Sequence, residues 1–426
     1  MKKRFLTLFS LLLFVGVGAS FVLTSCEKEE ESLLGSVKVQ LVLDEGLADI
    51  SFENVNVSLF NTFDNSEKKT LSNIDGVANF LELPAGVYNL SVEQPREDGE
   101  YTYTLTGNLN GITVRMGEET SVTVAVRAAV ANAGLVIKEI YHPGAGDLYT
   151  SLFKDQFLEI FNNSDEVIYA DGLYVGGVFT TSSSRTELPL SGYVNTEEEL
   201  LLEFVYQIPS NATGTLNPIE PGKGFMIAWN AMNFKEGSSL PEKAVDNTIA
   251  DYEIYTADWV EETLGRDGHI WDMNNPDVPN VTPIFIAEEY LYSMILMDTS
   301  DPAIVLFRID GVGAENIYNL QYKSNGGADK ELELFKIPTS AVIDGVEVLE
   351  NSTLGDWKKL PASIDASFKC LKDDGGAFYS SMSVRRKMDP VLSAKLGRVV
   401  LQDLNNSALD FESLDYPDAK GYNNLY

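Results

Sequence analysis

Cysteine and histidine are both scarce in this chain, whose 426 residues include two of each. One cysteine, Cys26, follows the first apolar run, and the other, Cys370, has no partner left if Cys26 is modified. We therefore expect no internal disulfide and place Cys370 in the core, because cysteine is among the most often buried residue types. His142 and His269 are far apart in the sequence, so the chain gives no case for a haem or a transition-metal site built on imidazoles.

Recognisable catalytic motifs are also absent. The sequence contains no CxxC pair, P-loop, GxSxG elbow or HExxH helix. General acid–base chemistry needs a positioned pair of groups, and a chain with 64 carboxylates singles out no particular pair. We expect a non-enzymatic protein with no cofactor other than the calcium ion considered below.

Basic residues are few relative to acidic ones. The chain has 31 Lys and Arg against 64 Asp and Glu, which gives a net charge of -33. A negative field repels phosphate backbones, so we do not expect nucleic acid as a partner. Apolar residues still make up 44% of the chain, which is enough for a sizeable core, and the length suggests two or three domains.

The first 25 residues have the layout of a secretory signal. Lys2, Lys3 and Arg4 form a positive start, and residues 5–23 are almost entirely apolar, with small residues toward the end. A run of this length would also suit an uncleaved membrane-spanning anchor. The residues that follow the run favour the signal, because a bare anchor helix needs no cysteine at its end.

The tetrapeptide "LTSC" at residues 23–26 resembles the bacterial lipobox, in which the cysteine is lipidated and the chain is cut just before it. The resemblance implies a signal peptide of residues 1–25 and a lipid anchor on Cys26. Each buried acyl CH₂ contributes ~0.8 kcal/mol, so several acyl chains together hold a protein on a membrane durably.

Residues 26–35 form an acidic segment that we interpret as a tether. Its charged run, Lys28, Glu29, Glu30 and Glu31, is either a solvated spacer or an export signal. The run resembles the Lys-plus-acidic signal of Bacteroidetes surface lipoproteins. That resemblance implies a location in the outer membrane, held by the lipid anchor, with the protein facing the cell exterior.

Residues 36–127 are predicted to form a β-sandwich. Runs such as "SVKVQLVL" and "SVTVAV" alternate apolar and polar residues, and Asp75-Gly76 and Pro84-Ala85-Gly86 supply turns. The central stretch "LSNIDGVANFLELPAGVYNLSVEQ" resembles carboxypeptidase-regulatory-like and collagen-adhesin B-type modules. The resemblance implies a transthyretin-like or immunoglobulin-like sandwich that serves as a stalk.

A second sandwich is expected over residues 135–426, after a small-residue linker at 128–134. The stretches "DQFLEIFNNSDEVIYADGLYVGG", "PAIVLFRIDG" and "QDLNNSALDF" resemble, in order, pieces of the lamin-tail domain. The implied fold is an immunoglobulin-like sandwich with insertions at about 180–216 and 235–301. The whole chain resembles a family of Bacteroidetes lipoproteins of undefined function, and the fold class is therefore all-β.

The second insertion contains the densest cluster of candidate ligands. Asp267, Asp272, Asn274 and Asp277 bring oxygen atoms into a Gly- and Pro-containing loop, as a calcium site requires, although the spacing differs from an EF-hand. Asp and Asn are also ordinary turn-forming residues whose side chains bind nearby backbone. The calcium site and the plain turn both remain open.

Four aromatic residues lie in or beside the same loop: Tyr252, Tyr255, Trp259 and Trp271. Exposed aromatic side chains would make a ligand-binding surface, because they stack on sugars or anchor partners. The alternative is that they pack into a small core of the insertion itself. Both interpretations are carried forward.

One basic cluster, "SVRRKMDP" at residues 383–390, stands out on the acidic chain. It is either a docking site or the ion-paired end of the last strands, and the lamin-tail resemblance favours the second. We expect a surface-exposed binding protein that is accessory to an outer-membrane (TonB-dependent) nutrient transporter. The alternatives are an adhesion or cell-envelope scaffold protein and, third, a secreted-type hydrolase.

Overall fold

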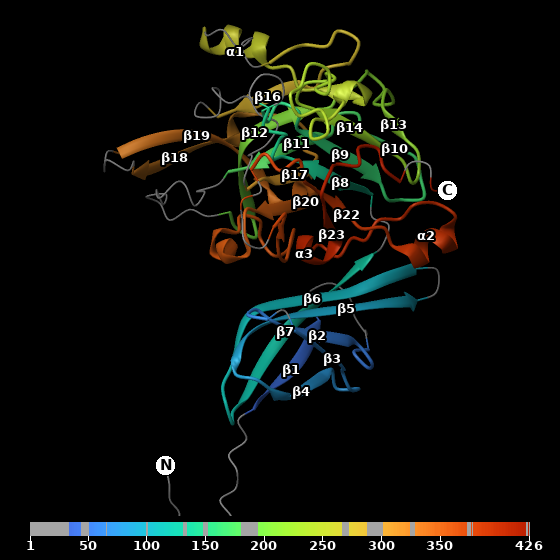
Figure 1. The fold of residues 1–426 in the computed structure, drawn as a ribbon, viewed down its shortest axis with the longest axis vertical. Helices are drawn as coiled ribbons and strands as arrows, with labels where there is room; N and C mark the ends of the chain where they lie inside the picture. Colours follow the sequence, from blue (N-terminus) through green and yellow to red (C-terminus); the bar gives the residue numbers. More distant parts are fainter. Residues whose placement is uncertain are drawn as a thin grey trace, which may run out of the picture.

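The structure is a computed structural model that describes most of the chain after the first 33 residues. The described residues are 34–43, 51–64, 66–98, 101–130, 134–147, 152–179, 195–265, 272–287, 301–323, 329–372, 376, 378–422 and 425. Two β-rich bodies follow one another along the chain, a smaller amino-terminal one and a larger carboxyl-terminal one (Figure 1). No helix within the described ranges is both long and apolar enough to cross a membrane.

The smaller body is a seven-stranded sheet with the order β3-β2-β5-β6-β7-β1-β4. Its strands are β1 (Gly35–Leu43), β2 (Asn56–Asn61), β3 (Glu67–Leu71), β4 (Val77–Leu83), β5 (Gly86–Asp98), β6 (Tyr101–Val114) and β7 (Glu119–Val130). Strand β7 joins the two halves, because its first part pairs in parallel with β1 and its last part pairs antiparallel with β6. The sheet folds around one core that draws on residues 37–126.

The alternation of apolar and polar residues along the strands explains why this body forms. In β1 the side chains of Val37, Val39 and Leu41 are buried while those between them are half-buried or exposed. One face of the strand therefore covers the core and the other faces solvent, as the period of two predicts. The first and last strands of the sheet, β3 and β4, also contact each other. Lys68 of β3 donates from Nζ to the carbonyl oxygens of Leu81 and Glu82 on β4.

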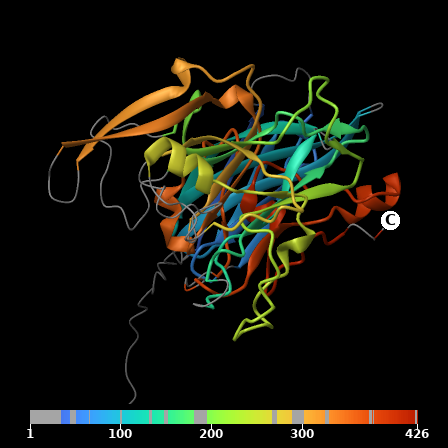
Figure 2. The ribbon, with the colours of Figure 1, turned by 90° about the horizontal axis from the view of Figure 1, so that it is seen from above.

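The larger body contains an eight-stranded sheet, a six-stranded sheet and a two-stranded ribbon. The eight-stranded sheet has the order β18-β19-β12-β11-β17-β20-β21, and β16 also pairs with β12. Its strands are β11 (Tyr174–Val178), β12 (Glu199–Gln207), β16 (Thr282–Ile286), β17 (Ala303–Phe307), β18 (Ile317–Lys323), β19 (Asp329–Pro338), β20 (Val342–Leu349) and β21 (Lys369–Cys370). The β18–β19 hairpin extends away from the body (Figure 2).

The six-stranded sheet has the order β15-β14-β9-β8-β22-β23. Its strands are β8 (Leu135–Tyr141), β9 (Phe157–Asn162), β14 (Gly224–Ala228), β15 (Tyr252–Glu253), β22 (Ser383–Arg386) and β23 (Phe411–Leu414), and the ribbon is β10 (Ile168–Tyr169) with β13 (Pro218–Ile219). The helices are short: α1 (Ala257–Leu264), α2 (Pro390–Leu396), α3 (Ser407–Asp410) and the 3₁₀ turns η1 (Asn247–Ile249), η3 (Ala314–Asn316), η4 (Thr339–Ala341) and η5 (Ser352–Trp357).

The two main sheets share one hydrophobic core that draws on residues 135–411. Close approach between strands in this core depends on Gly177, since a Cβ atom there would lie 2.1 Å from Cε1 of Phe204. Each body therefore has a core of its own. The prediction of an all-β fold built from two sandwich bodies is confirmed.

One predicted insertion is part of the sheet. Residues 199–207 fall within the segment 180–216, but they form β12, which pairs with β11 on one side and with β19 on the other. Its seven interior residues are buried. Residues 282–286, inside the second segment, form β16 and pair with β12 as well. These two strands are therefore part of the sheet that covers the core, and not loops added to it. Their pairing also satisfies backbone groups that an edge strand would leave unpaired.

Candidate functional site

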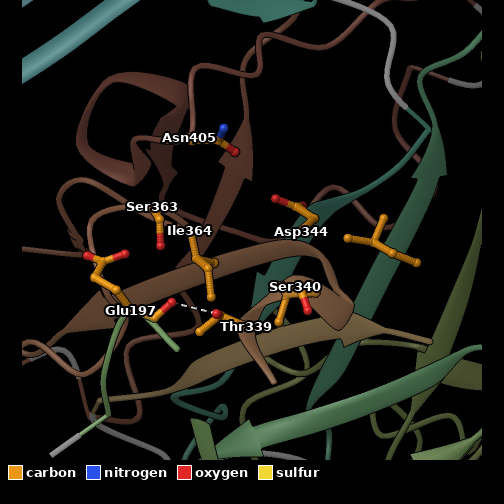
Figure 3. A pocket seen from close by; sticks show the side chains of 9 residues that line it. Glu197, Thr339, Ser340, Asp344, Ser363, Ile364 and Asn405 are labelled. Atoms are coloured by element: carbon orange, nitrogen blue, oxygen red, sulfur yellow. Dashed lines mark hydrogen bonds between the residues drawn. The ribbon is translucent and has the colours of Figure 1, made fainter. Parts of the chain in front are cut away.

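A polar pocket of about 350 Å³ opens on the larger body, near the start of β20 (Figure 3). It is lined by nine residues: Glu197, Thr339, Ser340, Val342, Ile343, Asp344, Ser363, Ile364 and Asn405. They come from the segment before β12, from η4, from the first half of β20, and from the segments before β21 and α3. Four stretches that are distant in the sequence, at 197, 339–344, 363–364 and 405, therefore meet at this one hollow.

Backbone contacts fix the rim of the pocket. Thr339 in η4 donates from its hydroxyl to the carbonyl oxygen of Glu197 at 2.6 Å, and its amide donates to the carbonyl oxygen of Glu198 at 2.9 Å. On the opposite rim Asn405 has a φ of 51°, in the left-handed region that Asn tolerates better than most residues. Its carbonyl oxygen accepts from the amide of Ala366 at 2.7 Å.

The floor of the pocket depends on a glycine. A Cβ atom on Gly345 would lie 2.4 Å from Cγ2 of Ile364, so only glycine lets Ile364 settle against β20. The segment that carries Ile364 is held from behind by the buried Asp365, which accepts from the backbone amides of Glu347 at 3.0 Å and Ser407 at 2.8 Å. The segment that carries Ile364 is thus tied by hydrogen bonds to β20 and to the start of α3.

The polar side chains of the pocket offer mainly hydrogen-bond acceptors. Asp344 points into it in Figure 3, and its Oδ1 accepts only from the neighbouring Gly345 amide, at 2.9 Å, among the contacts of the described residues. The buried Oγ of Ser363 has no hydrogen-bond partner within the part of the chain that the structure describes. The lining contains two carboxylates and no Lys, Arg, His or aromatic residue.

A buried arginine lies directly behind the pocket. Arg386 of β22 is 1% exposed, and its Nη2 donates to Oδ2 of Asp344 at 2.8 Å. Its Nη1 donates to Oδ1 of Asp403 at 2.9 Å and lies 3.5 Å from Oδ2 of Asp410. Nε donates to the carbonyl oxygen of Ile137 at 2.8 Å, and the guanidinium stacks on Phe411.

This cluster combines one guanidinium with three carboxylates. Burial raises the pKa of Asp410 well above its ordinary value, and the charge of Asp403 adds to that shift, although Arg386 opposes it. Burial likewise raises the pKa of Asp344, against the attraction of Arg386. Burial thus favours the neutral forms of Asp344 and Asp410, while Arg386 favours the charged ones.

A second buried charge cluster lies beneath the last residues of the chain. The strand β8 carries a bulge at Lys138, between the pairs Ile137–Ile160 and Glu139–Glu159. Both Lys138 and Glu139 are buried, as is Glu159 on β9, and Nζ of Lys138 lies 2.8 Å from Oε2 of Glu159. Bulges re-aim side chains in this way and are common near functional sites.

The cover over this cluster is the segment 415–422, which we call the carboxyl-terminal strap. The amide of Asp418 donates to Oε1 of Glu139 at 3.0 Å, and the amide of Lys420 donates to Oε1 of Glu159 at 2.7 Å. Lys138 donates from Nζ to the carbonyl oxygen of Gly421 at 2.5 Å. Backbone groups of the strap therefore give each of the three charged side chains one hydrogen bond, although Oε2 of Glu139 has no partner among the described residues.

Burial makes Glu139 sensitive to pH. Desolvation, helped by the charge of Glu159, raises the pKa of Glu139 from 4.5 to about 7, and Ser383 and Lys138 oppose the shift. The folded protein therefore holds this proton more tightly than the unfolded chain. The resulting stabilisation is complete below pH 4.5 and is lost as the pH rises through 7.

We expect Glu139→Gln to remove part of that pH dependence. The amide keeps an acceptor oxygen for Ser383 and Asp418 but cannot ionise, so the variant should retain on the order of 1–3 kcal/mol that the wild type loses between pH 4.5 and 7. Chemical denaturation at several pH values measures this. The exposed Glu242→Gln should follow the wild type, and parallel curves for wild type and Glu139→Gln would refute the assignment.

The predicted ligand loop is placed in part. Asp272 is buried, and its Oδ2 accepts from the backbone amides of Thr256 at 2.6 Å and Ala257 at 3.1 Å, and from the Thr256 hydroxyl. It thereby caps the first turn of α1, where amides have no partner within the helix. Asn274 accepts from the side chain of Asn280 at 3.0 Å, and Asp277 is exposed.

These contacts correspond to the turn interpretation of Asp272 and Asn274. Across the ranges that the structure describes, no three His, Cys, Asp or Glu residues are grouped to hold a metal ion. Asp267 and His269 lie outside those ranges. Calcium binding by the loop stays a prediction.

The aromatic residues of the loop are mostly packed. Tyr252 is 8% exposed, and its hydroxyl donates to Oδ1 of Asn217. Trp259 on α1 is half-buried against the main core. Tyr255 is half-buried, with its hydroxyl 3.3 Å from Oδ1 of Asp258, and Trp271 lies outside the described residues. Ligand binding by these aromatic residues stays a prediction.

The remaining sequence predictions have different outcomes. Cys26, Lys28, Glu29, Glu30 and Glu31 lie outside the described residues. Cys370 is half-buried at the sheet edge in β21, rather than in the core. His142 is buried directly after β8. Arg385 and Arg386 of the basic cluster form the ion pairs that the structural interpretation predicted.

Sequence reasoning did not find the pocket residues. The sequence around Asp344 predicts a strand and that around Asn405 predicts the closing segment, and the spacing of their side chains does not indicate a site. The only available cue was the buried-strand pattern of "AVIDGVEVL", where an Asp interrupts an apolar run. An acidic residue in such a run predicts a partner, but it does not identify Arg386.

Comparisons with known proteins relate the chain to one family. Residues 220–418 match the family described as "Protein of unknown function (DUF4876)". A DUF4876 family protein from Bacteroides thetaiotaomicron VPI-5482 has a crystal structure similar to this chain, with a TM-score of 0.55 and 21% sequence identity over 88% of this chain and 94% of that chain. At this identity the likeness establishes the fold alone.

A DUF3823 family protein from Parabacteroides merdae ATCC 43184 was also matched, over 34% of this chain and 67% of that chain, with 11% identity. Its TM-score of 0.16 is too low to support an argument. No curated protein matches the chain. The carboxypeptidase-regulatory-like and lamin-tail-like assignments stay predictions. Residues 220–418 are thus similar to a family of unknown function, and the chain shares the fold of a protein of that family from Bacteroides thetaiotaomicron.

Proposed function

We propose that this protein is a lipid-anchored binding protein of the outer membrane, displayed toward the cell exterior and accessory to a nutrient transporter. The anchor rests on Cys26 in its lipobox-like context, and the display rests on the run from Lys28 to Glu31. The partnership with a transporter is an inference from the habits of surface lipoproteins with such signals.

The polar pocket is the observation that carries the binding role. A volume of about 350 Å³ falls within the usual range for small-molecule sites. Its polar groups converge from four segments of the chain, and Oγ of Ser363 is buried with no partner in the described part of the chain. A buried hydroxyl without a partner is costly unless a ligand or water satisfies it.

Binding explains the described acidic groups better than catalysis does. Three carboxyl groups whose pKa is raised to about 7, those of Glu139, Asp155 and Glu253, are all buried, and none of them lines the pocket. A catalytic acid or base must reach the substrate. A hydrolase therefore ranks below a binding protein in the proposal.

An adhesion or scaffold role is the second candidate, and the β18–β19 hairpin favours it. The hairpin projects from the larger body, and β18 is the terminal strand of the eight-stranded order (Figures 1 and 2). Terminal strands can pair with an extended segment of another protein. A scaffold would use this edge and would need no small molecule.

The pocket can be blocked to separate these functions. Ser340→Trp places a bulky ring at the exposed rim, and Ser210→Trp places the same ring on a distant exposed loop as a control. We expect the wild type and the Ser210 variant, isolated from membranes, to carry a small molecule detectable by native mass spectrometry and to co-purify with a β-barrel transporter. The Ser340 variant should lose the small molecule. Equal retention by all three proteins, or no retention by any, would contradict the proposal.

A further inference from the structure

Exposed apolar side chains gather at one end of the smaller body. They belong to the residue before β1, to the β2–β3 turn, to the ends of β4 and β5 that flank their connection, and to the β6–β7 turn. We call this set the apolar rim, and its members, with the exposed fraction of each, are Leu34 (38%), Phe63 (96%), Leu81 (66%), Val87 (42%) and Met116 (61%). Single exposed apolar residues are ordinary, whereas a group of them at one end of a body indicates a contact surface.

Backbone contacts place the members of the rim at the same end of the strands. In the β6–β7 turn, the amide of Gly117 donates to the carbonyl oxygen of Leu34 at 3.3 Å. In the β2–β3 turn, the amide of Thr62 donates to the carbonyl oxygen of Val87 at 3.0 Å. Strand pairing joins the start of β1 to the end of β4, and the start of β5 to the end of β6. The turns that carry the rim are therefore neighbours.

The rim lies at the end of the smaller body that points away from the larger one. Strands β1 and β7 run parallel, so the start of β1 lies beside the start of β7. Strand β7 then runs for 12 residues to Val130, and the larger body begins with β8 at Leu135. At ~3.3 Å per residue, the two ends of β7 are up to about 36 Å apart. Figure 1 shows β1 starting at the lower end of the smaller body, with the larger body beyond the upper end.

The expected lipid anchor is tied to this same end. Residues 27–33 separate the cysteine of the lipobox-like sequence, Cys26, from Leu34. An extended chain advances by at most ~3.6 Å per residue, so the eight steps from Cys26 to Leu34 span at most about 29 Å. A protein anchored through Cys26 therefore keeps the apolar rim within reach of the bilayer, and the larger body farther from it.

The chemistry of the rim suits the apolar part of a lipid surface. The chain has a net charge of -33, so it offers no general attraction to anionic head groups. Within the β6–β7 turn, Arg115 and Glu118 pair with each other at 3.5 Å. Apolar side chains such as Phe63 and Met116 gain by leaving water for the boundary between head groups and acyl chains. Contact with lipid would thus depend on buried apolar area.

We propose that the apolar rim rests on the bilayer that holds the lipid anchor, so that the smaller body stands upright on the membrane. This inference rests on the anchor of the proposed function and adds the surface by which the anchored protein contacts lipid. The short tether gives the rim a high effective concentration at the membrane, so a contact too weak to hold the protein alone still forms. The larger body, with its pocket, is then held away from the lipid.

The test is the quenching of one added tryptophan by lipids that carry bromine on the acyl chain near the head group. The chain has no Trp before residue 229, so Phe63→Trp adds one to the rim and Ile74→Trp adds one to the β3–β4 turn. Ile74 is 72% exposed and lies near the other end of β1, because the neighbouring Gly76 accepts at its carbonyl oxygen from the amide of Leu41. The lipidated full-length proteins are reconstituted into phosphatidylcholine vesicles with and without bromine.

We expect bromine to lower the emission added by Phe63→Trp at least twofold and to leave the emission added by Ile74→Trp unchanged. Adding Met116→Glu to Phe63→Trp should at least halve the quenching, because a charge in the rim opposes contact with acyl chains. Adding Ile74→Glu to Phe63→Trp should not change it. All of these positions are exposed, so the fold should tolerate the substitutions.

The other outcomes overturn the inference. Equal quenching for Phe63→Trp and Ile74→Trp would show that the protein has no preferred face toward lipid. Protection of Phe63→Trp from aqueous iodide without quenching by bromine would assign the rim to contact with a second copy of the chain. No quenching, with an intact mass that shows lipid on Cys26, would refute the contact surface and leave the anchor standing. A mass without lipid would refute the anchor itself, and the inference with it.

Discussion

Arg386→Ala should destabilise the larger body by about 3–5 kcal/mol, the range expected when one partner of a buried ion pair is removed. The guanidinium is 1% exposed and is bound by three carboxylates and two backbone carbonyls. Without it, Asp344 and Asp410 would be buried carboxyl groups with no positive charge between them. Much of the loss comes from these remaining charges, which must take up protons or draw in water.

Arg385→Ala is the matched control, since it removes the same side chain from the adjacent position of β22. Arg385 pairs with Glu412 and Asp418, whose side chains are 39% and 53% exposed. Partly exposed pairs of this kind contribute about 0–1 kcal/mol. Urea denaturation of both variants measures the difference. Similar losses for Arg385→Ala and Arg386→Ala would contradict the buried network as the main support of this region.

The Arg386→Ala change should also affect the pocket, because Asp344 both lines the pocket and accepts a hydrogen bond from Arg386. A destabilised variant that still folds at low temperature should therefore lose ligand affinity as well as stability. Arg385→Ala should keep its affinity. A loss of both stability and affinity in the Arg386 variant, but not in the Arg385 variant, is expected only if the ion pairs of Arg386 support the pocket.

The sequence was sufficient for the fold class and for the first sandwich, because alternation in strands such as β1 is a local signal. It was insufficient for β8, where "LVIKEIY" is buried throughout. Lys138 and Glu139 look like solvent-facing residues in the sequence. They are buried because a bulge turns them toward the strap, which is formed by residues nearly 280 positions later. A contact at such separation leaves no local pattern.

The candidate site was missed for a related reason. The pocket draws on four short segments, and its two acidic residues, Glu197 and Asp344, are far apart in the sequence. In the loop that is richest in Asp and Asn, at least Asp272 has a structural role, because its carboxylate accepts from the amides at the start of α1. Aspartate near a helix start serves equally as a cap or as a ligand, and only the position of the amides distinguishes the two.

Cys26→Ser should abolish membrane anchoring. Lipidation needs the thiol, which serine cannot replace, and several acyl chains at ~0.8 kcal/mol per buried CH₂ account for a durable anchor. The variant should accumulate as unprocessed precursor or as free periplasmic protein.

Replacing Lys28 to Glu31 by neutral residues should leave lipidation intact but hide the protein from protease added to whole cells. Unchanged digestion of that second variant would assign the run a spacer role only.

The central claim is that the protein is an envelope-anchored binding protein, and fractionation of cells that express the wild type or Cys26→Ser tests it most directly. Labelling with a tagged fatty acid, followed by separation of outer membrane from soluble protein, gives the measurement. We predict a labelled wild type in the outer membrane and an unlabelled variant absent from it. A serine variant that still fractionates with the outer membrane at the wild-type level would contradict the account.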